Sequence, residues 1–194
     1  MGLTSIRFCS NMCVMLYKLP WARIEADWPT TVITDHLEKS AHTDPGKADA
    51  YDQQVQSGHP TVQQHMFVDA AIALGLQDPY VLIHNQLPGQ QMPLHTDFGS
   101  PKRFPDLSES QHRAQIERVF VFLDDWRPGQ IVQMAGDTVP PWKRGDVLWF
   151  DWRLAEHGTA NIGTKTRPSL LITGKASDRF WQIHRSQRLT TIKI

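Results

Sequence analysis

The chain has 194 residues, and its 20 lysines and arginines balance its 20 aspartates and glutamates, so its formal net charge is zero. This length suffices for one domain with a sizeable core, and the balanced charge argues against a nucleic-acid partner, since nonspecific binding to nucleic acid requires excess positive charge. The apolar run over residues 13–17 is too short for a membrane span and too broken by polar neighbours for a signal peptide. The sequence therefore predicts a cytoplasmic protein without a membrane partner.

Residues 1–78 are expected to form helices and loops that support the rest of the domain. A rough 3.6-residue apolar stripe over residues 59–76 predicts a helix. Cys9 and Cys13 lie four positions apart. This spacing is compatible with a redox or metal-binding pair or, in the plainer interpretation, with two small residues on an N-terminal strand or helix.

From residue 80 onward, β-forming residues recur in short runs separated by Gly and Pro turns. Eight such runs are typical of a β-sandwich or barrel. A polar insertion at residues 98–115, with a helical patch near its end, interrupts this rhythm, and we expect a loop this long to act as a substrate lid. The predicted strands cover residues 80–87, 93–97, 117–124, 130–135, 137–141, 147–151, 156–160 and 168–174.

The motif His-x-Asp or His-x-Glu occurs three times, at residues 36–38, 42–44 and 95–97. About one occurrence is expected by chance in a chain of this composition, so the context must discriminate among them. Only His95 and Asp97 are expected on a strand, where residues i and i+2 point to the same side and can chelate one ion. The alternative for this pair is a turn in which the aspartate caps the backbone beside an unrelated histidine.

A third ligand is expected from a neighbouring strand, and His157, at the start of the seventh predicted strand, is the candidate. Two histidines and one carboxylate leave three positions open on iron(II). Ten residues further on (167 − 157), Arg167 begins the last strand, where its guanidinium could bind a carboxylate bidentately, and the Ser169 hydroxyl faces the same side. Taken alone, His157 is also compatible with a satisfied core histidine, and Arg167 with a surface cation.

Together, the motifs at residues 95–97, 157 and 167–169 resemble the signature of the iron(II)- and 2-oxoglutarate-dependent oxygenases. The resemblance covers about residues 80–175. It implies a mainly β fold, a double-stranded β-helix (the jelly-roll or cupin barrel) flanked by N-terminal helices, within a single domain over residues 1–194.

Two further stretches, at residues 118–130 and 142–152, are similar to uncharacterised bacterial and phage members of this superfamily. The second is also similar to the aspartyl/asparaginyl β-hydroxylases. Those enzymes commonly lack the acidic ligand, and the halogenases of the family replace it with a small residue. The presence of Asp97 therefore favours a hydroxylase outside both groups.

The resemblance implies Fe(II) bound by His95, Asp97 and His157, with 2-oxoglutarate as co-substrate, its far carboxylate on Arg167 and Ser169, and O2 as the oxidant. The implied activity is hydroxylation of an unactivated C–H bond in a small molecule or an amino-acid or peptide side chain, with release of succinate and CO2. A desaturase with the same cofactors and a non-catalytic, cupin-like module that binds a small ligand are the alternatives.

Other side chains have weaker claims to the site. Gln86 is preferred to Asn85 as a co-substrate contact, because strand alternation allows only one of the two to face the cavity. Arg118 is either a contact for substrate or co-substrate, or a solvated strand-end cation paired with Glu117 or another acid. Four aromatic residues either wall the cavity or belong to the ordinary core: Phe120, Phe122, Trp149 and Phe150.

Overall fold

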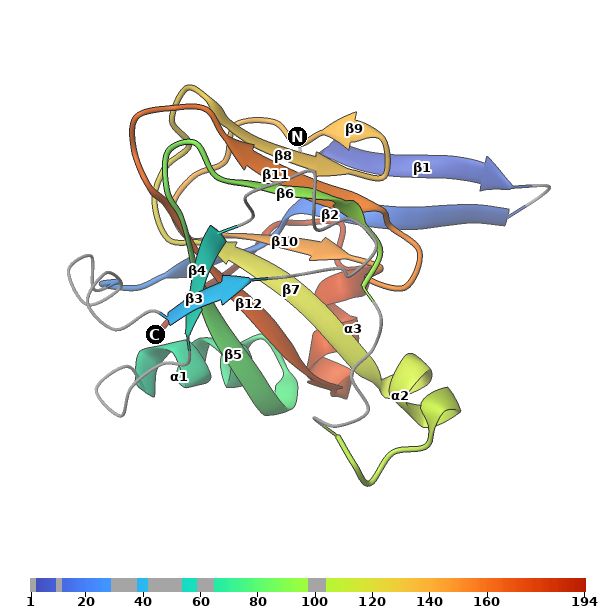
Figure 1. Cartoon of the computed structure of the whole chain (residues 1–194). Helices are drawn as coiled ribbons and strands as arrows, with labels where there is room; N and C mark the ends of the chain where they lie inside the picture. The colour runs from blue at the N-terminus through green and yellow to red at the C-terminus, as the bar shows by residue number, and fades with distance from the viewer. Residues whose placement is uncertain (1–2, 10–11, 29–37, 42–53, 59–64, 98–103) are drawn as a thin grey trace.

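Two packed β-sheets form the body of the protein, as a computed structural model shows for residues 3–9, 12–28, 38–41, 54–58, 65–97 and 104–194 (Figure 1). Helices pack against the larger of the two sheets. The elements in chain order are β1 (Leu3–Cys9), β2 (Met12–Glu25), β3 (Glu38–Ala41), β4 (Gln54–Gly58), α1 (His65–Ala73), β5 (Leu76–Gln86), β6 (Gln91–His95), α2 (Glu109–Gln115), β7 (Ile116–Phe122), β8 (Gln130–Met134), β9 (Asp137–Thr138), β10 (Asp146–Phe150), β11 (His157–Asn161), β12 (Arg167–Ala176), α3 (Asp178–Arg185) and β13 (Thr190–Lys193).

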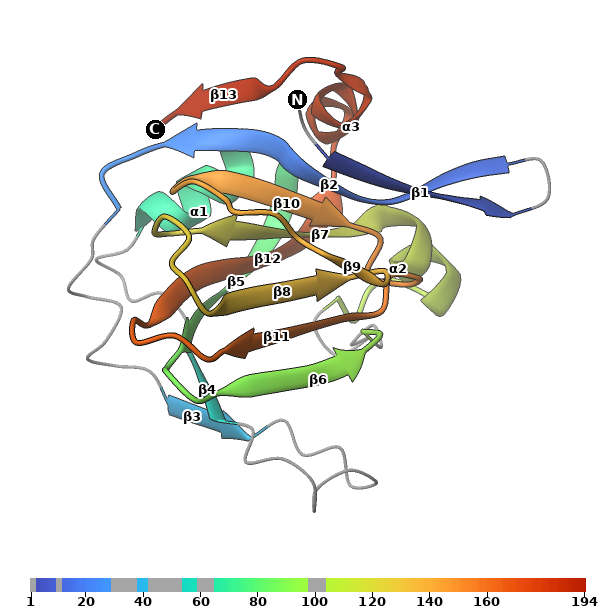
Figure 2. The same ribbon diagram turned by 90° about the horizontal axis from the view of Figure 1, so that it is seen from above.

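The strand order identifies the architecture. The larger sheet runs β1-β2-β10-β7-β12-β5-β4-β3, with β13 paired in parallel to β2, and the smaller sheet runs β6-β11-β8-β9. From β5 to β12 the chain passes back and forth between the two sheets, and every pairing among these strands is antiparallel (Figure 2). This arrangement is a jelly-roll, or cupin, core.

The eight strands predicted from residue 80 onward are confirmed as β5 to β12, with their ends shifted by a few residues. The largest extension is at the start of β5, which begins at Leu76 because this residue pairs with Ala176 of β12. The weakest predicted strand shrinks to the two residues of β9, Asp137–Thr138.

Alternation along β7 divides the apolar side chains between two cores. Val119 and Val121 pack on the outer face of the larger sheet, whereas Phe122 packs between the sheets. There it stacks on Trp142, with ring centroids 4.1 Å apart, near Met134 of the smaller sheet. Complete burial of such a side chain contributes about 1.5–3 kcal/mol. β7, buried on both faces, therefore holds the two layers together.

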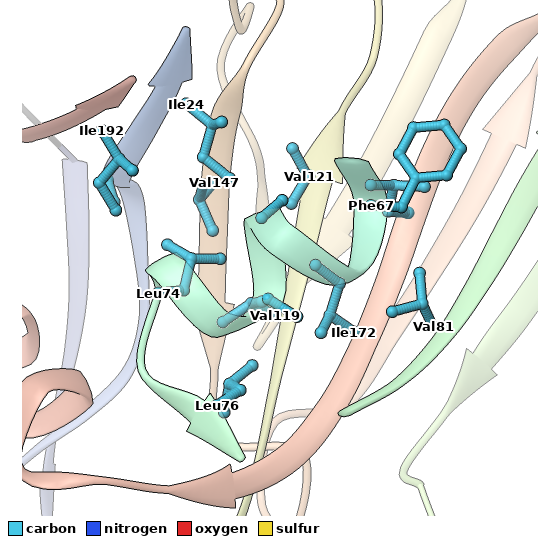
Figure 3. Close-up of a cluster of buried hydrophobic side chains, with 14 of the residues drawn as sticks. Ile24, Phe67, Leu74, Leu76, Val81, Val119, Val121, Val147, Ile172 and Ile192 are labelled. Atoms are coloured by element: carbon cyan, nitrogen blue, oxygen red, sulfur yellow. The ribbon is translucent and has the colours of Figure 1, made fainter. Parts of the chain in front are cut away.

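Helix α1 covers the outer face of the larger sheet, where Phe67 and Leu74 lie against residues such as Ile172 (Figure 3). The helix is followed by Gly75, whose φ of +84° is readily adopted only by glycine. A Cβ at this position would lie 2.5 Å from the backbone nitrogen of Phe180, so glycine also allows α3 to approach. Within the described residues, no helix is long and apolar enough to cross a membrane.

The expectation of helices and loops over residues 1–78 is wrong for most of the described part of this region. β1 and β2 form an antiparallel hairpin, and β3 and β4 extend the opposite edge of the larger sheet. The helix predicted at residues 59–76 is confirmed at His65–Ala73. Cys9 and Cys13 lie on the paired strands β1 and β2, in agreement with the plainer interpretation. β2 is a strand because β1, β10 and β13 pair with it, and the pairings with β10 and β13, which are distant in sequence, leave no local periodic signal.

Candidate metal centre

Two histidines meet where β6 ends and β11 begins. His95 and His157 are Cα partners in the ladder, and their ring centroids are 4.4 Å apart. Nδ1 of His95 lies 2.8 Å from the carbonyl oxygen of Pro93, and Nδ1 of His157 lies 3.0 Å from that of Ala155. Because a carbonyl can only accept a hydrogen bond, the proton of each neutral ring belongs on Nδ1. Both Nε2 lone pairs are then available to a metal ion.

Asp97 completes the group. Its Oδ1 lies 3.6 Å from Nε2 of His95, and its Oδ2 lies 3.6 Å from Nε2 of His157. The ligand atoms of the three residues all lie within 4.8 Å of one another, so the group could hold a metal ion. Two imidazoles and one carboxylate are the facial ligand set typical of non-haem iron(II), which leaves further coordination positions open.

The strand argument for this pair is only partly right. β6 ends at His95, and Asp97 lies two residues beyond it. Strand alternation therefore does not place the carboxylate. The side chain is instead held by Arg118 of β7, whose Nη1 donates a hydrogen bond to Oδ2.

Arg118 is buried, and its Nε donates to Oγ1 of Thr173 at 3.1 Å. The expected alternative, a solvated strand-end cation paired with Glu117 or another acid, is wrong about solvation and about Glu117, but the pairing with another acid is confirmed in Asp97. Neighbouring residues on a strand face opposite sides, and Glu117 pairs with Arg153 at 2.7 Å. A direct contact of Arg118 with a substrate or co-substrate stays a prediction.

The electrostatics of the group favour the protonation state that a metal ion requires at Asp97 and His157, whereas at His95 they favour the protonated ring that a metal ion must displace. Burial raises the pKa of Asp97, but its contact with His95 and the charge of Arg118 outweigh burial and hold that pKa well below its usual range. Burial lowers the pKa of His95, but Asp97 and the Pro93 carbonyl raise it by more, so its net shift is upward. Burial keeps the pKa of His157 below its ordinary value. At neutral pH the carboxylate is ionised and His157 is neutral.

A second polar group lies on the inner face of the larger sheet. Arg167 and Gln86 are Cα partners in the β5–β12 ladder, and Ser169 has the same orientation as Arg167. Nε2 of Gln86 donates to Oγ1 of Thr159 at 2.9 Å, and Thr159 lies on β11 two residues after His157. The co-substrate residues expected from the sequence therefore lie on one face, directed toward the strand that carries a metal ligand.

Three buried atoms of this second group have no hydrogen-bond partner among the described residues: Nε of Arg167, Oγ of Ser169 and Oε1 of Gln86. Arg167 is 4% exposed, and its Nη1 reaches only the carbonyl oxygen of Ile131, at 3.5 Å. Burial lowers the pKa of Arg167 to about 9. A buried cation without an anion is unfavourable. The residues thus fit a ligand with one carboxylate at Arg167 and a chelating end at the metal group, as 2-oxoglutarate has.

Aromatic rings line part of the interior between the metal group and Arg167. Phe150 lies against His157, with ring centroids 4.8 Å apart, and Phe120 lies against His84 at 5.8 Å. Trp149 does not line it, because it belongs to the outer core. The indole of Trp149 instead packs edge-on against the imidazole of His184 on α3.

The described part of the predicted lid, residues 104–115, contains the expected helix. α2 is stabilised by a capping box in which Ser108 and Gln111 exchange side-chain to backbone hydrogen bonds. His112 on this helix packs edge-on against Trp152 at 5.8 Å. Through Trp152 this segment adjoins the surroundings of the metal group.

Sequence reasoning missed Thr159, although alternation from His157 points to it. It also missed Trp152, which lies in the turn after β10 and is brought over the Arg118 guanidinium only by the fold. Residues 98–103 of the predicted lid lie outside the described residues, as do the histidines of the two competing motifs, His36 and His42.

No protein-family model matches the sequence, and no curated protein matches it. Solved structures match it with low identity. A Pseudomonas putida prolyl-4-hydroxylase is 15% identical with a TM-score of 0.45, over 69% of this chain and 81% of that chain. A predicted oxalate decarboxylase from Thermotoga maritima is 15% identical with a TM-score of 0.43, over 73% and 94%. The Schizosaccharomyces pombe Cnp3 cupin domain is 10% identical with a TM-score of 0.41, over 90% and 87%. Since such similarity says nothing about the reaction, function rests on the site.

Proposed function

We propose that the chain is an iron(II)- and 2-oxoglutarate-dependent dioxygenase that hydroxylates an unactivated C–H bond of a small molecule or an amino-acid side chain, releasing succinate and CO2. One juxtaposition supports this proposal: the ligand triad lies across the sandwich from a buried Arg167 that has no carboxylate partner among the described residues. A 2-oxo acid with a second carboxylate matches both ends of this space. The bound metal and co-substrate supply the oxidising chemistry.

The chain's own residues bind and orient the metal ion and the co-substrate. The Nδ1 hydrogen bonds to backbone carbonyls fix the two imidazoles with Nε2 directed at the ion. Arg167 binds the far carboxylate through a charge-assisted pair, to which the Ser169 hydroxyl adds a hydrogen bond. Gln86, held by Thr159, lines the path between the two ends. Phe120 and Phe150 keep water from the reacting atoms.

Anaerobic titration with Fe(II), with and without 2-oxoglutarate, tests the proposal. Chelation of a 2-oxo acid by iron(II) produces a visible charge-transfer band, which we expect for the wild type and not for His157→Ala. His184→Ala is the matched control, because it removes an imidazole packed against Trp149 on the far face of the sheet, and it should retain the band. Metal binding without the band would favour the non-catalytic binding module, and failure to bind metal would refute the triad.

Turnover assays separate the two oxidative outcomes. Oxygen uptake and succinate release, measured against a panel of amino acids, peptides and small metabolites, identify substrates that accelerate co-substrate consumption. Mass spectrometry of the product then distinguishes the gain of one oxygen atom, expected for the hydroxylase, from the loss of two hydrogen atoms, expected for the desaturase.

A further inference from the structure

Asp97 is the one member of the triad that the sheet does not hold. His95 and His157 are fixed within the β6–β11 ladder, whereas Asp97 follows the end of β6. Its two oxygens have different partners. Oδ2 accepts a hydrogen bond from Arg118 and also lies 3.6 Å from Nε2 of His157, whereas Oδ1 has no contact with Arg118 and lies 3.6 Å from Nε2 of His95.

Arg118 is itself held from several directions. Its Nε donates to Thr173, its direct cross-strand partner on β12. Its guanidinium carbon lies 5.3 Å from the centre of the Trp152 ring, and that indole is anchored by a 3.0 Å hydrogen bond to the carbonyl of Ile116. The Arg118 side chain is 8% exposed. A planar guanidinium with these contacts has little freedom, unlike a surface arginine.

We propose that Arg118 is a positioning residue that keeps Asp97 monodentate, by retaining Oδ2 on its guanidinium and leaving Oδ1 for the metal ion. The proposal rests on the metal site of the proposed function and not on the oxidative reaction. A bidentate carboxylate would occupy one of the three positions that the facial triad otherwise leaves open. Arg118 therefore preserves the vacant coordination that a chelating co-substrate requires.

Two effects of Arg118 on metal affinity have opposite signs. Its positive charge disfavours a nearby divalent cation, whereas its hold on Asp97 favours metal binding because the carboxylate is already in place. The proposal requires positioning to outweigh charge, and the close contact between the buried Arg118 and Asp97 is the observation that favours this. Without Arg118, the carboxylate would be free to turn away or to bind through both oxygens.

Co(II) titration followed by calorimetry and by visible absorption measures both steps, first the affinity for the metal and then the affinity of the Co(II)-loaded protein for 2-oxoglutarate. Arg118→Met removes the positive charge and the hydrogen-bond donors of the guanidinium. We expect at least about tenfold weaker Co(II) binding, the loss typical of residues that orient metal ligands, and weaker 2-oxoglutarate binding to the loaded protein. Arg118→Lys keeps the charge but loses the Thr173 anchor, and we expect a smaller loss.

The matched control is Arg127→Met, which makes the same change at a half-exposed arginine paired with Asp124 at 3.7 Å, and which should bind Co(II) as the wild type does. Equal or tighter Co(II) binding by Arg118→Met together with undiminished 2-oxoglutarate affinity would overturn the proposal, because Asp97 would then leave the same coordination positions open without Arg118. If that variant fails to fold, Arg118→Lys decides, and unchanged Co(II) affinity would refute positioning. Failure of the proposed function looks different: the wild type would bind Co(II) but not 2-oxoglutarate.

Discussion

Arg167 is a residue at which the binding of an anion would change the stability of the protein. The side chain is 4% exposed and has no anionic partner among the described residues. Removing a buried cation of this kind relieves the free-energy cost of its desolvation, whereas removing half of a buried ion pair would add to that cost. The same substitution therefore has opposite effects on the free protein and on its complex.

We predict that Arg167→Met raises the free energy of unfolding of the ligand-free protein by about 1–4 kcal/mol, the range of stabilisation seen when buried ion pairs are replaced by apolar groups. In the wild type, 2-oxoglutarate with Co(II) should raise the melting temperature above that with Co(II) alone, and in the variant this increment should disappear. Thermal unfolding measures both effects. A ligand-free variant less stable than the wild type would show that the guanidinium has a structural role instead.

Among the elements, α2 is the helix whose stability depends most visibly on a single cap. Ser108 and Gln111 form reciprocal hydrogen bonds at its N-terminus. We predict that Ser108→Ala costs about 0.5–2 kcal/mol of local stability, so that amide hydrogen exchange over residues 109–115 accelerates. Ser177→Ala is the control, because Ser177 precedes α3 without forming a side-chain cap and its loss should leave exchange in α3 unchanged. Equal protection of α2 in both variants would contradict the prediction.

The elements that sequence reasoning found are those with strong local signals. Runs of β-formers closed by Gly and Pro turns located β5 to β12, and period-two alternation placed Gln86 rather than Asn85 on the inner face. The same alternation would have excluded Trp149, since its neighbour Phe150 lies against His157 and only one of the two can face inward.

What could not be predicted depends on pairing between distant segments. β3 and β4 are polar strands that join the edge of β5, and no apolar alternation marks them. The partner of Arg118 was equally hidden, because Asp97 is 21 residues away in sequence and reaches it only when the two sheets pack together. A side chain with several acidic neighbours along the chain gives no local indication of which one it will contact.

For the whole molecule, Glu117 links stability to pH. It is 1% exposed and lies between Arg153 and the indole of Trp149. Burial raises its pKa to about 7, despite the charge of Arg153 and the hydrogen bond from Trp149, from an ordinary value of 4.5. The folded state therefore binds this proton more tightly than the unfolded chain. The resulting stability is complete below pH 4.5 and is lost as the pH rises through 7.

We predict that this loss amounts to roughly 3 kcal/mol in the wild type and is absent in Glu117→Gln. Urea unfolding at pH 5 and pH 8 measures it as the difference between the two free energies of unfolding. Glu109→Gln, which changes an acid that is 79% exposed on α2, should keep the wild-type pH dependence. A variant at 117 with the same pH dependence as the wild type would rule out Glu117 as its source.

The two ends of the proposed co-substrate space belong to different layers of the sandwich. The imidazole ligands come from the smaller sheet and Arg167 from the larger, and such sheets stack about 10 Å apart. The span available to a dicarboxylic acid is thus set by the thickness of the core and not by any loop. Trimming or enlarging Phe122 or Met134, which lie between the layers as cross-strand partners of Ser169 and His157, would shift the preference toward shorter or longer acids, so that core side chains that bind neither the metal nor the acid determine the ligand length.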